Sequence, residues 1–140
     1  MIESSALVPV SEAIAALLNV QALRDLGVTV WDEIPADSPF PTVGYTITET
    51  PWRSMGQPGQ AVELRIHTFT QYEGMRTAHQ IIDVVVGLLG VAVSASMPMA
   101  GWIFQWADYQ GTVPMPDEII NGQLTQHLQA RWLIVVTADA

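Results

Sequence analysis

The sequence of 140 residues contains neither lysine nor cysteine. Without cysteine it has no disulfide, no thiolate nucleophile and no cysteine-ligated metal site, which fits a reducing compartment. Five arginines stand against fourteen aspartates and glutamates, so the formal net charge is -9. Affinity for a phosphate backbone comes from cationic side chains that release counterions, and an acidic surface repels DNA. The composition therefore argues against sequence-independent binding of nucleic acid or of an anionic membrane.

A targeting segment and a membrane-spanning segment are also missing. The start, MIESSALVPVSEAIAALL, carries glutamates and lacks the basic residues of a signal peptide. The most apolar stretch, IIDVVVGLLGVAV, is interrupted by Asp83 and is too short to span a bilayer. We therefore expect a soluble protein, and the length predicts a single domain over residues 1–140.

Apolar residues are abundant for a chain of this size. Hydrophobic residues make up 49% of the sequence and charged residues only 14%, and there are five tryptophans. A small monomer has limited interior, so we expect part of this apolar surface to be buried between subunits. A tryptophan-rich core is the alternative explanation.

Hydrophobic periodicity divides the chain into helices and strands. Helical spacing predicts helices over 9–25 and 74–89, and alternation predicts strands over 28–34, 42–50, 61–70, 101–110 and 122–137. The segments 51–60 and 111–121 contain prolines and glycines and are interpreted as loops. Runs of strands with helices between them predict an α+β fold, a mainly antiparallel sheet of about four to five strands with two helices packed on one face.

Three prolines, Pro35, Pro39 and Pro41, stiffen the segment DEIPADSPFPTV just before a predicted strand. Proline fixes φ and biases the preceding residue toward extended geometry, so this segment is pre-set for the start of the strand. Phe40 is held between two of these prolines. We interpret it as an apolar anchor, buried either in its own core or against a neighbouring subunit.

The candidate catalytic residues do not combine into an enzyme site. His79 and Asp83 are four residues apart on the second predicted helix, but two groups do not complete a metal or acid–base site. His67 and His127 lie on the less apolar faces of their strands, where solvent or a subunit contact explains them. Glycine-rich phosphate-binding motifs and the G-x-S-x-G motif of serine hydrolases are absent. We expect no catalysis, no cofactor and no metal.

Two groups of aromatic residues are candidates for a subunit or partner interface. Trp102 and Trp106 share parity on one predicted strand, which predicts an aromatic face that is at least partly core. In the 51–60 loop, Arg53 lies beside Trp52 and close to Met55. An aromatic residue next to an arginine is typical of an interface anchor, and a loop folded back over the sheet edge is the alternative.

Three longer stretches together resemble the small tail-completion, or tail-terminator, proteins of long-tailed bacteriophages. The first is ALRDLGVTVWDEIPADSPFPTVGY, in which a helix end leads through a short strand and a proline-rich turn to the next strand. The second is VELRIHTFTQYEGMRTAHQIIDVVVGLLG, a strand running into a helix, and the third is NGQLTQHLQARWLIVV, a polar turn before a long closing strand. The resemblance covers most of the chain and rests on the order and spacing of these elements.

The resemblance implies a structural function without catalysis or cofactor. Such proteins form a homo-oligomeric ring, commonly a hexamer, that caps the head-proximal end of the tail tube. The ring stops tube polymerisation and joins the tail to the head connector, and DNA passes through it without being tightly bound. The protein is then expected in the tail or neck of the virion, and in the host cytoplasm during assembly. Asp117 and Glu118, adjacent in a predicted loop, are candidates for an acidic lumen or a partner contact.

Other functions remain open at this point. Within the same class, the chain is alternatively another neck or connector component, which would differ in the partner that it binds. From a different class, a small α+β enzyme or ligand-binding domain would need an apolar pocket near Trp102 and Trp106, together with converging polar residues that the sequence does not display. A host oligomerisation module is a third possibility.

Overall fold

The computed structural model describes residues 5–32, 34, 38–54, 57–71, 74–92 and 97–139. The helices are α1 (Leu7–Leu18), α2 (Gln21–Asp25) and α3 (Gly74–Gly90). The strands are β1 (Thr29–Trp31), β2 (Thr42–Ser54), β3 (Gln57–Thr70), β4 (Trp102–Ile120) and β5 (Gln123–Ala138). Among the helices in the described ranges, none has the length and apolar character needed to cross a membrane.

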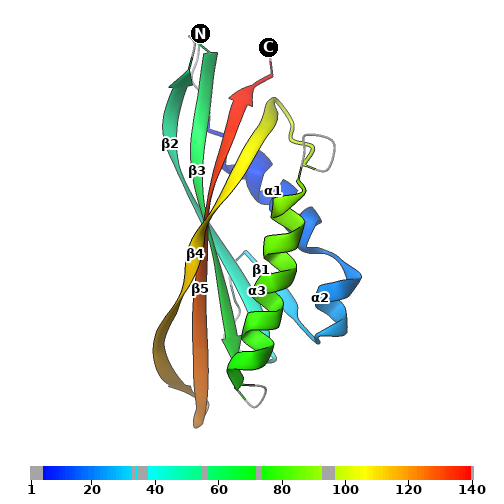
Figure 1. Cartoon of the computed structure of the whole chain (residues 1–140), viewed down its shortest axis with the longest axis vertical. Helices are drawn as coiled ribbons and strands as arrows, with labels where there is room; N and C mark the ends of the chain where they lie inside the picture. Colours follow the sequence, from blue (N-terminus) through cyan, green and yellow to red (C-terminus); the bar gives the residue numbers. More distant parts are fainter. Residues whose placement is uncertain are drawn as a thin grey trace.

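The strands form one sheet in the order β1-β2-β3-β5-β4. β1 pairs parallel with β2, and the other neighbours are antiparallel. All three helices lie on the same side of this twisted sheet (Figure 1). The predicted fold class is confirmed, with one difference in the helices. The predicted helix over 9–25 is divided because Val20 adopts an extended backbone, with φ -125° and ψ 153°.

The core lies between the helices and the face of the sheet that they cover. Val62, Leu64 and Ile66 of β3 are completely buried, and on β5 the alternate residues from Leu128 to Val136 are buried in the same way. On α3 the stripe predicted from helical spacing packs against this face, with Ala78, Ile81, Ile82, Val85 and Leu89 buried. Alternation on the strands and the 3.6-residue period on α3 therefore identified the core correctly.

The prediction of two loops was wrong, because strand residues occupy 51–54, 57–60 and 111–120 of these segments. β2 and β3 continue toward each other as far as the pair Ser54↔Gln57, and β4 covers the whole of 102–120. Proline is tolerated in a strand where a ladder donor is not needed. Pro51 and Pro58 lie where their strands have a partner on one side only, and Pro114 lies on the edge strand β4.

The connection between β4 and β5 is a tight turn of two residues, Asn121 and Gly122. Their φ values are 53° and 77°, so both lie in the left-handed region. Asparagine followed by glycine is the pair that a type I′ turn favours, because its backbone twist matches that of the flanking strands. The turn fixes the register of the long β4–β5 hairpin, which closes at Ile120↔Gln123.

The proline-rich segment before β2 is held by hydroxyl groups. Trp31 Nε1 donates to Ser38 Oγ over 3.0 Å, and the hydroxyls of Ser38 and Thr42 are 3.1 Å apart. Ser38 and Thr42 are both buried, and Pro41 between them is buried as well. Phe40 is only partly buried within the chain, and Pro35 lies outside the described residues. The segment is thus attached to the parallel β1–β2 pair.

Candidate interaction surface

The face of the sheet opposite the helices, here called the open face, carries no described helix (Figure 1). Side chains alternate across a strand, so residues next to the buried ones point to this face. On β3 they are Glu63, Arg65, His67 and Phe69, and on β5 they are His127, Gln129, Arg131, Leu133 and Val135. His127 and Val135 are themselves buried in spite of lying on this face. The open face is therefore mixed, with charged, imidazole and apolar groups side by side.

Two arginines lie near the middle of the open face. Arg65 and Arg131 are directly opposite each other on β3 and β5, and we call them the arginine pair. Arg65 Nε is 2.7 Å from Glu63 Oε1, and Arg131 Nε is 3.7 Å from the same oxygen. Both arginine side chains are 46% exposed, so they remain accessible. The cluster has two positive charges and one negative charge, which is unusual in a chain with a net charge of -9.

Two histidines meet on the same face, one row of the sheet away from the arginine pair. His67 Nδ1 and His127 Nε2 are 2.9 Å apart and share one hydrogen bond, whose donor depends on the tautomers. The ring of Phe69 stacks on His127 with centroids 4.2 Å apart. Burial lowers the pKa of both imidazoles below 6.5, and the charges of His127 and Arg65 lower the pKa of His67 further. The pair is therefore neutral near pH 7.

The sequence alone places both histidines on less apolar strand faces and does not predict their contact. Their contact depends on the register of β3 with β5, in which His67 faces Gln129 and His127 faces Phe69. His79 and Asp83 are exposed on α3. Within the described ranges, no three or more histidine, cysteine, aspartate or glutamate residues are grouped so that they could hold a metal ion.

The aromatic face predicted from Trp102 and Trp106 does not exist as one surface. The register shifts between Phe104 and Trp106, because Phe104 pairs with Val136 and Trp106 pairs with the next residue, Val135. This bulge moves Trp106 to the open face, where it is 42% exposed. Trp102 is only 9% exposed and belongs to the core of this chain. Of the two tryptophans, Trp106 is the one available to a partner.

The end of the β4–β5 hairpin, residues 117–124, is a second exposed surface and is called the hairpin tip. Asp117 and Glu118, expected in a loop, lie instead at the end of β4, next to a register shift, and both are exposed. Ile119 and Leu124 pair across the two strands and are 70% and 54% exposed. In Figure 1 the tip forms the lower end of the molecule, apart from the helices. It presents two carboxylates beside an apolar pair.

The other predicted interface residues are Phe40, which lies before β2, and the neighbouring residues Trp52, Arg53 and Met55. Trp52 and Arg53 are paired with Gly59 and Pro58 near the end of β2, and their side chains lie outside the description. Met55 lies outside the described residues. Phe40 is partly buried beside β1 and β2.

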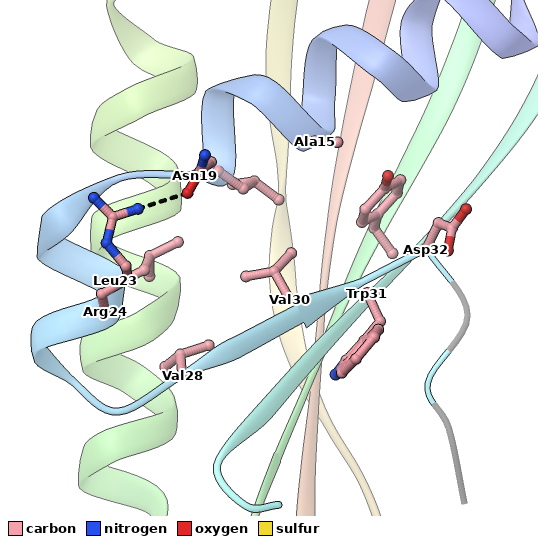
Figure 2. Close-up of a pocket in the computed structure, with 10 residues that line it drawn as sticks. Ala15, Asn19, Leu23, Arg24, Val28, Val30, Trp31 and Asp32 are labelled. Atoms are coloured by element: carbon pink, nitrogen blue, oxygen red, sulfur yellow. Dashed lines mark hydrogen bonds between the residues drawn. The ribbon is translucent and has the colours of Figure 1, made fainter. Parts of the chain in front are cut away.

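A pocket of about 490 Å³ lies between α1, α2, β1 and β2 (Figure 2). Apolar side chains such as Leu23, Val28 and Val30 line it, and Arg24 lies at its rim with Nη1 2.5 Å from Asn19 Oδ1. Neither Trp102 nor Trp106 lines this pocket, so it is not the apolar pocket that an enzyme or ligand-binding domain would need beside them. Asp32 adds a carboxylate at the opposite end of the pocket from Arg24 (Figure 2).

Comparison with solved structures shows a shared fold. The chain has the fold of a protein chain in the virion of a native gene transfer agent particle, with a TM-score of 0.74. The match covers 97% of this chain and 100% of that chain, at 14% sequence identity. No protein-family model matches the sequence, and no curated protein does. The shared fold therefore stands without close sequence similarity.

Proposed function

We propose that this protein is a structural subunit of a phage-like virion. The observation that carries the proposal is the fold shared with a gene transfer agent virion chain, with nearly complete coverage of both chains. The sequence supports the same class independently, because its element order resembles that of phage tail-terminator proteins. The proposed role is structural and non-catalytic, and it needs no cofactor.

Within this class, we propose a tail terminator. The subunits assemble into a ring, commonly a hexamer, on the head-proximal end of the tail tube, stop its polymerisation and bind the head-side connector. A ring needs contacts between two different surfaces of the same chain. The open face and the hairpin tip are two such exposed surfaces, and Trp106, Ile119 and Leu124 offer apolar area at them.

The charge of the chain suits a conduit through which DNA passes. A net charge of -9 without lysine gives little attraction for a phosphate backbone. We propose that DNA moves through the ring on ejection without being held, and that exposed carboxylates such as Asp117 and Glu118 face the lumen or a partner. In a gel-shift assay at low salt the purified protein should leave duplex DNA unshifted.

Electron microscopy of the purified protein, alone and mixed with tail-tube subunits, tests the proposal. We expect discrete rings, or tubes capped at one end, and tubes that stop growing once the protein is added. Trp106→Ser should weaken capping because it removes an exposed aromatic side chain from the open face. Val91→Ser is the matched control, since Val91 is 78% exposed just after α3, away from the sheet face.

The outcomes separate the alternatives. A protein that ignores tubes at high concentration would contradict the tail-terminator assignment. Binding to the head-side connector without binding to tubes would assign the chain to another neck component instead. Persistence as a monomer in isolation is compatible with a ring that forms only on the tube, so the mixture with tubes is the decisive sample.

A further inference from the structure

We propose that the hairpin tip of one copy docks on the open face of the next copy, with its carboxylates against the arginine pair. The inference deepens the proposed function, because it names the two surfaces that join neighbouring subunits of the ring. It does not depend on which end of a tail the ring occupies. The contact is head-to-tail, so each copy uses a different surface toward each neighbour.

The receiving side is defined by a local excess of positive charge at the arginine pair. In the described structure Asp108, which pairs with Leu133 on the same face, forms no ion pair with either arginine. The arginine pair shares a single carboxylate, that of Glu63, so one guanidinium charge is left without a counter-charge inside this cluster. Like charges directly opposite each other on adjacent strands are unfavourable. A further carboxylate placed over the pair would remove that repulsion. Trp106 and Val113, 42% and 51% exposed on the same face, supply apolar area beside the charges.

The donating side has the complementary features. The hairpin tip carries Asp117 and Glu118, both exposed, and in the described structure no arginine or histidine nitrogen forms an ion pair with them. Next to them, Ile119 and Leu124 form a cross-strand apolar pair that no described element covers. An apolar centre with charged groups around it is the usual composition of a protein interface.

Charge also indicates that the partner is a second copy. The chain has fourteen carboxylates and five arginines, so two copies repel each other over most orientations. An attractive contact must bring an arginine of one copy to a carboxylate of the other. Of the arginines whose side chains are described, Arg24 and Arg76 lie singly on α2 and α3, whereas Arg65 and Arg131 lie together. The open face is therefore the strongest attractor for an acidic hairpin.

Charge reversal in two separate chains tests the contact. One variant reverses the tip (Asp117→Arg with Glu118→Arg) and the other reverses the face (Arg131→Glu). Each variant alone should self-associate at least about tenfold more weakly than the wild type, because like charges then meet at the contact. Mixed together, the two variants should associate again, since the reversed tip of one matches the reversed face of the other. Sedimentation velocity of the full chain measures each sample.

Matched controls carry the same changes of charge elsewhere on the surface. Glu12→Arg with Asp83→Arg, exposed on α1 and α3, matches the tip variant, and Arg76→Glu, exposed on α3, matches the face variant. Both controls should leave self-association close to the wild-type value. Circular dichroism should show that all variants are folded. Wild-type association should weaken as salt is raised from about 0.05 M to about 0.5 M, because the charges are screened.

Several results would overturn the proposal. They are variants that associate like the wild type and a mixture that does not recover. If the wild type is monomeric in isolation, the contact is tested on tail tubes, and variants that cap tubes as well as the wild type would overturn it. The tail-terminator role is judged separately by capping of tubes. Recovery in the mixture together with uncapped tubes would leave the contact standing and reject the role. Capping of tubes by both variants would leave the tail-terminator role standing and reject the contact.

Discussion

Arg65 and Arg131 face each other across β3 and β5, and both guanidinium groups lie within 4 Å of the same carboxylate oxygen of Glu63. Glu63 therefore holds together two side chains that would otherwise repel each other. Its own side chain is 30% exposed, so water screens the interaction in part. The arrangement gives the open face its positive centre and makes Glu63 a residue whose removal has a definite consequence.

We expect Glu63→Gln to lower the free energy of unfolding by about 1 kcal/mol at low salt, because the arginine pair then lacks its counter-charge. Adding Arg131→Gln should recover part of that loss by removing the repulsion. Urea denaturation of the two variants measures both effects. Glu12→Gln, exposed on α1, is the control and should change the free energy little. If Glu63→Gln lowered the free energy of unfolding by the same amount with Arg131 present and with Arg131→Gln, this account would be contradicted.

The histidine pair predicts a pH dependence with a definite sign. Both pKa values are lowered in the folded chain, chiefly by burial, so the unfolded chain binds more protons as the pH falls below 6.5. The stability that the neutral pair contributes is complete above pH 6.5 and is lost as the pH falls through the folded pKa values. We expect the wild type to lose more stability than His127→Gln between pH 7 and pH 5, as measured by urea denaturation.

The matched control for that experiment is His79→Gln, because His79 is exposed on α3 and has no contact with the pair. Its pH profile should parallel that of the wild type. If His127→Gln also ran parallel to the wild type, the hydrogen bond between His67 and His127 would not influence stability in this range. The two variants carry the same chemical change, so their difference isolates the position.

The elements that were predictable from the sequence are those with a strong period. Alternation on β3 and β5 and the stripe on α3 predicted the buried face, because burial there follows the two-residue period of a strand and the 3.6-residue period of a helix. The Asn121–Gly122 pair likewise corresponds to the turn that it forms, since only a few residues accept positive φ. These features depend on neighbours in the chain or on one repeating pattern.

The features that escaped prediction depend on register or on position in the sheet. Prolines at 51, 58 and 114 suggested loops, but each lies where its strand has a neighbour on one side only. A single bulge carried Trp106 out of the face of Trp102. The meeting of His67 with His127 follows from the alignment of β3 with β5. Alternation along a strand predicts the side of the sheet on which a residue lies, but it does not predict the register, and so it does not predict the partner residue on the next strand.

Gly44 is expected to resist enlargement because of one neighbour. A β-carbon added at Gly44 would lie 2.6 Å from Ile34 Cδ1 and 2.7 Å from Cγ1, which is too close for carbon atoms. Gly44→Ala should lower the free energy of unfolding by about 1–3 kcal/mol, the usual cost of overpacking. In an Ile34→Ala background the same change should cost less. If Gly44→Ala lowered the free energy of unfolding equally in both backgrounds, the loss would come from the backbone and not from contact with Ile34.

Gly87→Ala is the control for glycine replacement in general. Gly87 lies inside α3, and a β-carbon there would meet no atom within 4 Å. Alanine should therefore raise the free energy of unfolding by about 0.5–1 kcal/mol, because glycine is a poor helix former. If the change in the free energy of unfolding has opposite signs at Gly44 and Gly87, the space available for the β-carbon decides the result at Gly44, and the flexibility of the unfolded chain does not.

The turn at the hairpin tip gives a last prediction that links stability with assembly. Gly122 has φ of 77°, a conformation that costs an L-residue about 1–2 kcal/mol. Gly122→Ala should lower the free energy of unfolding by that amount, as measured by urea denaturation. The same strain should loosen the tip, where Ile119 and Leu124 depend on the register that the turn sets, so self-association should weaken as well.

Gly27→Ala, with φ of 75° after α2, is the matched control, because it carries similar strain far from the tip. If both variants lost stability equally but only Gly122→Ala lost association, the tip would be identified as a contact surface. Equal loss of association in both would instead assign the effect to stability alone.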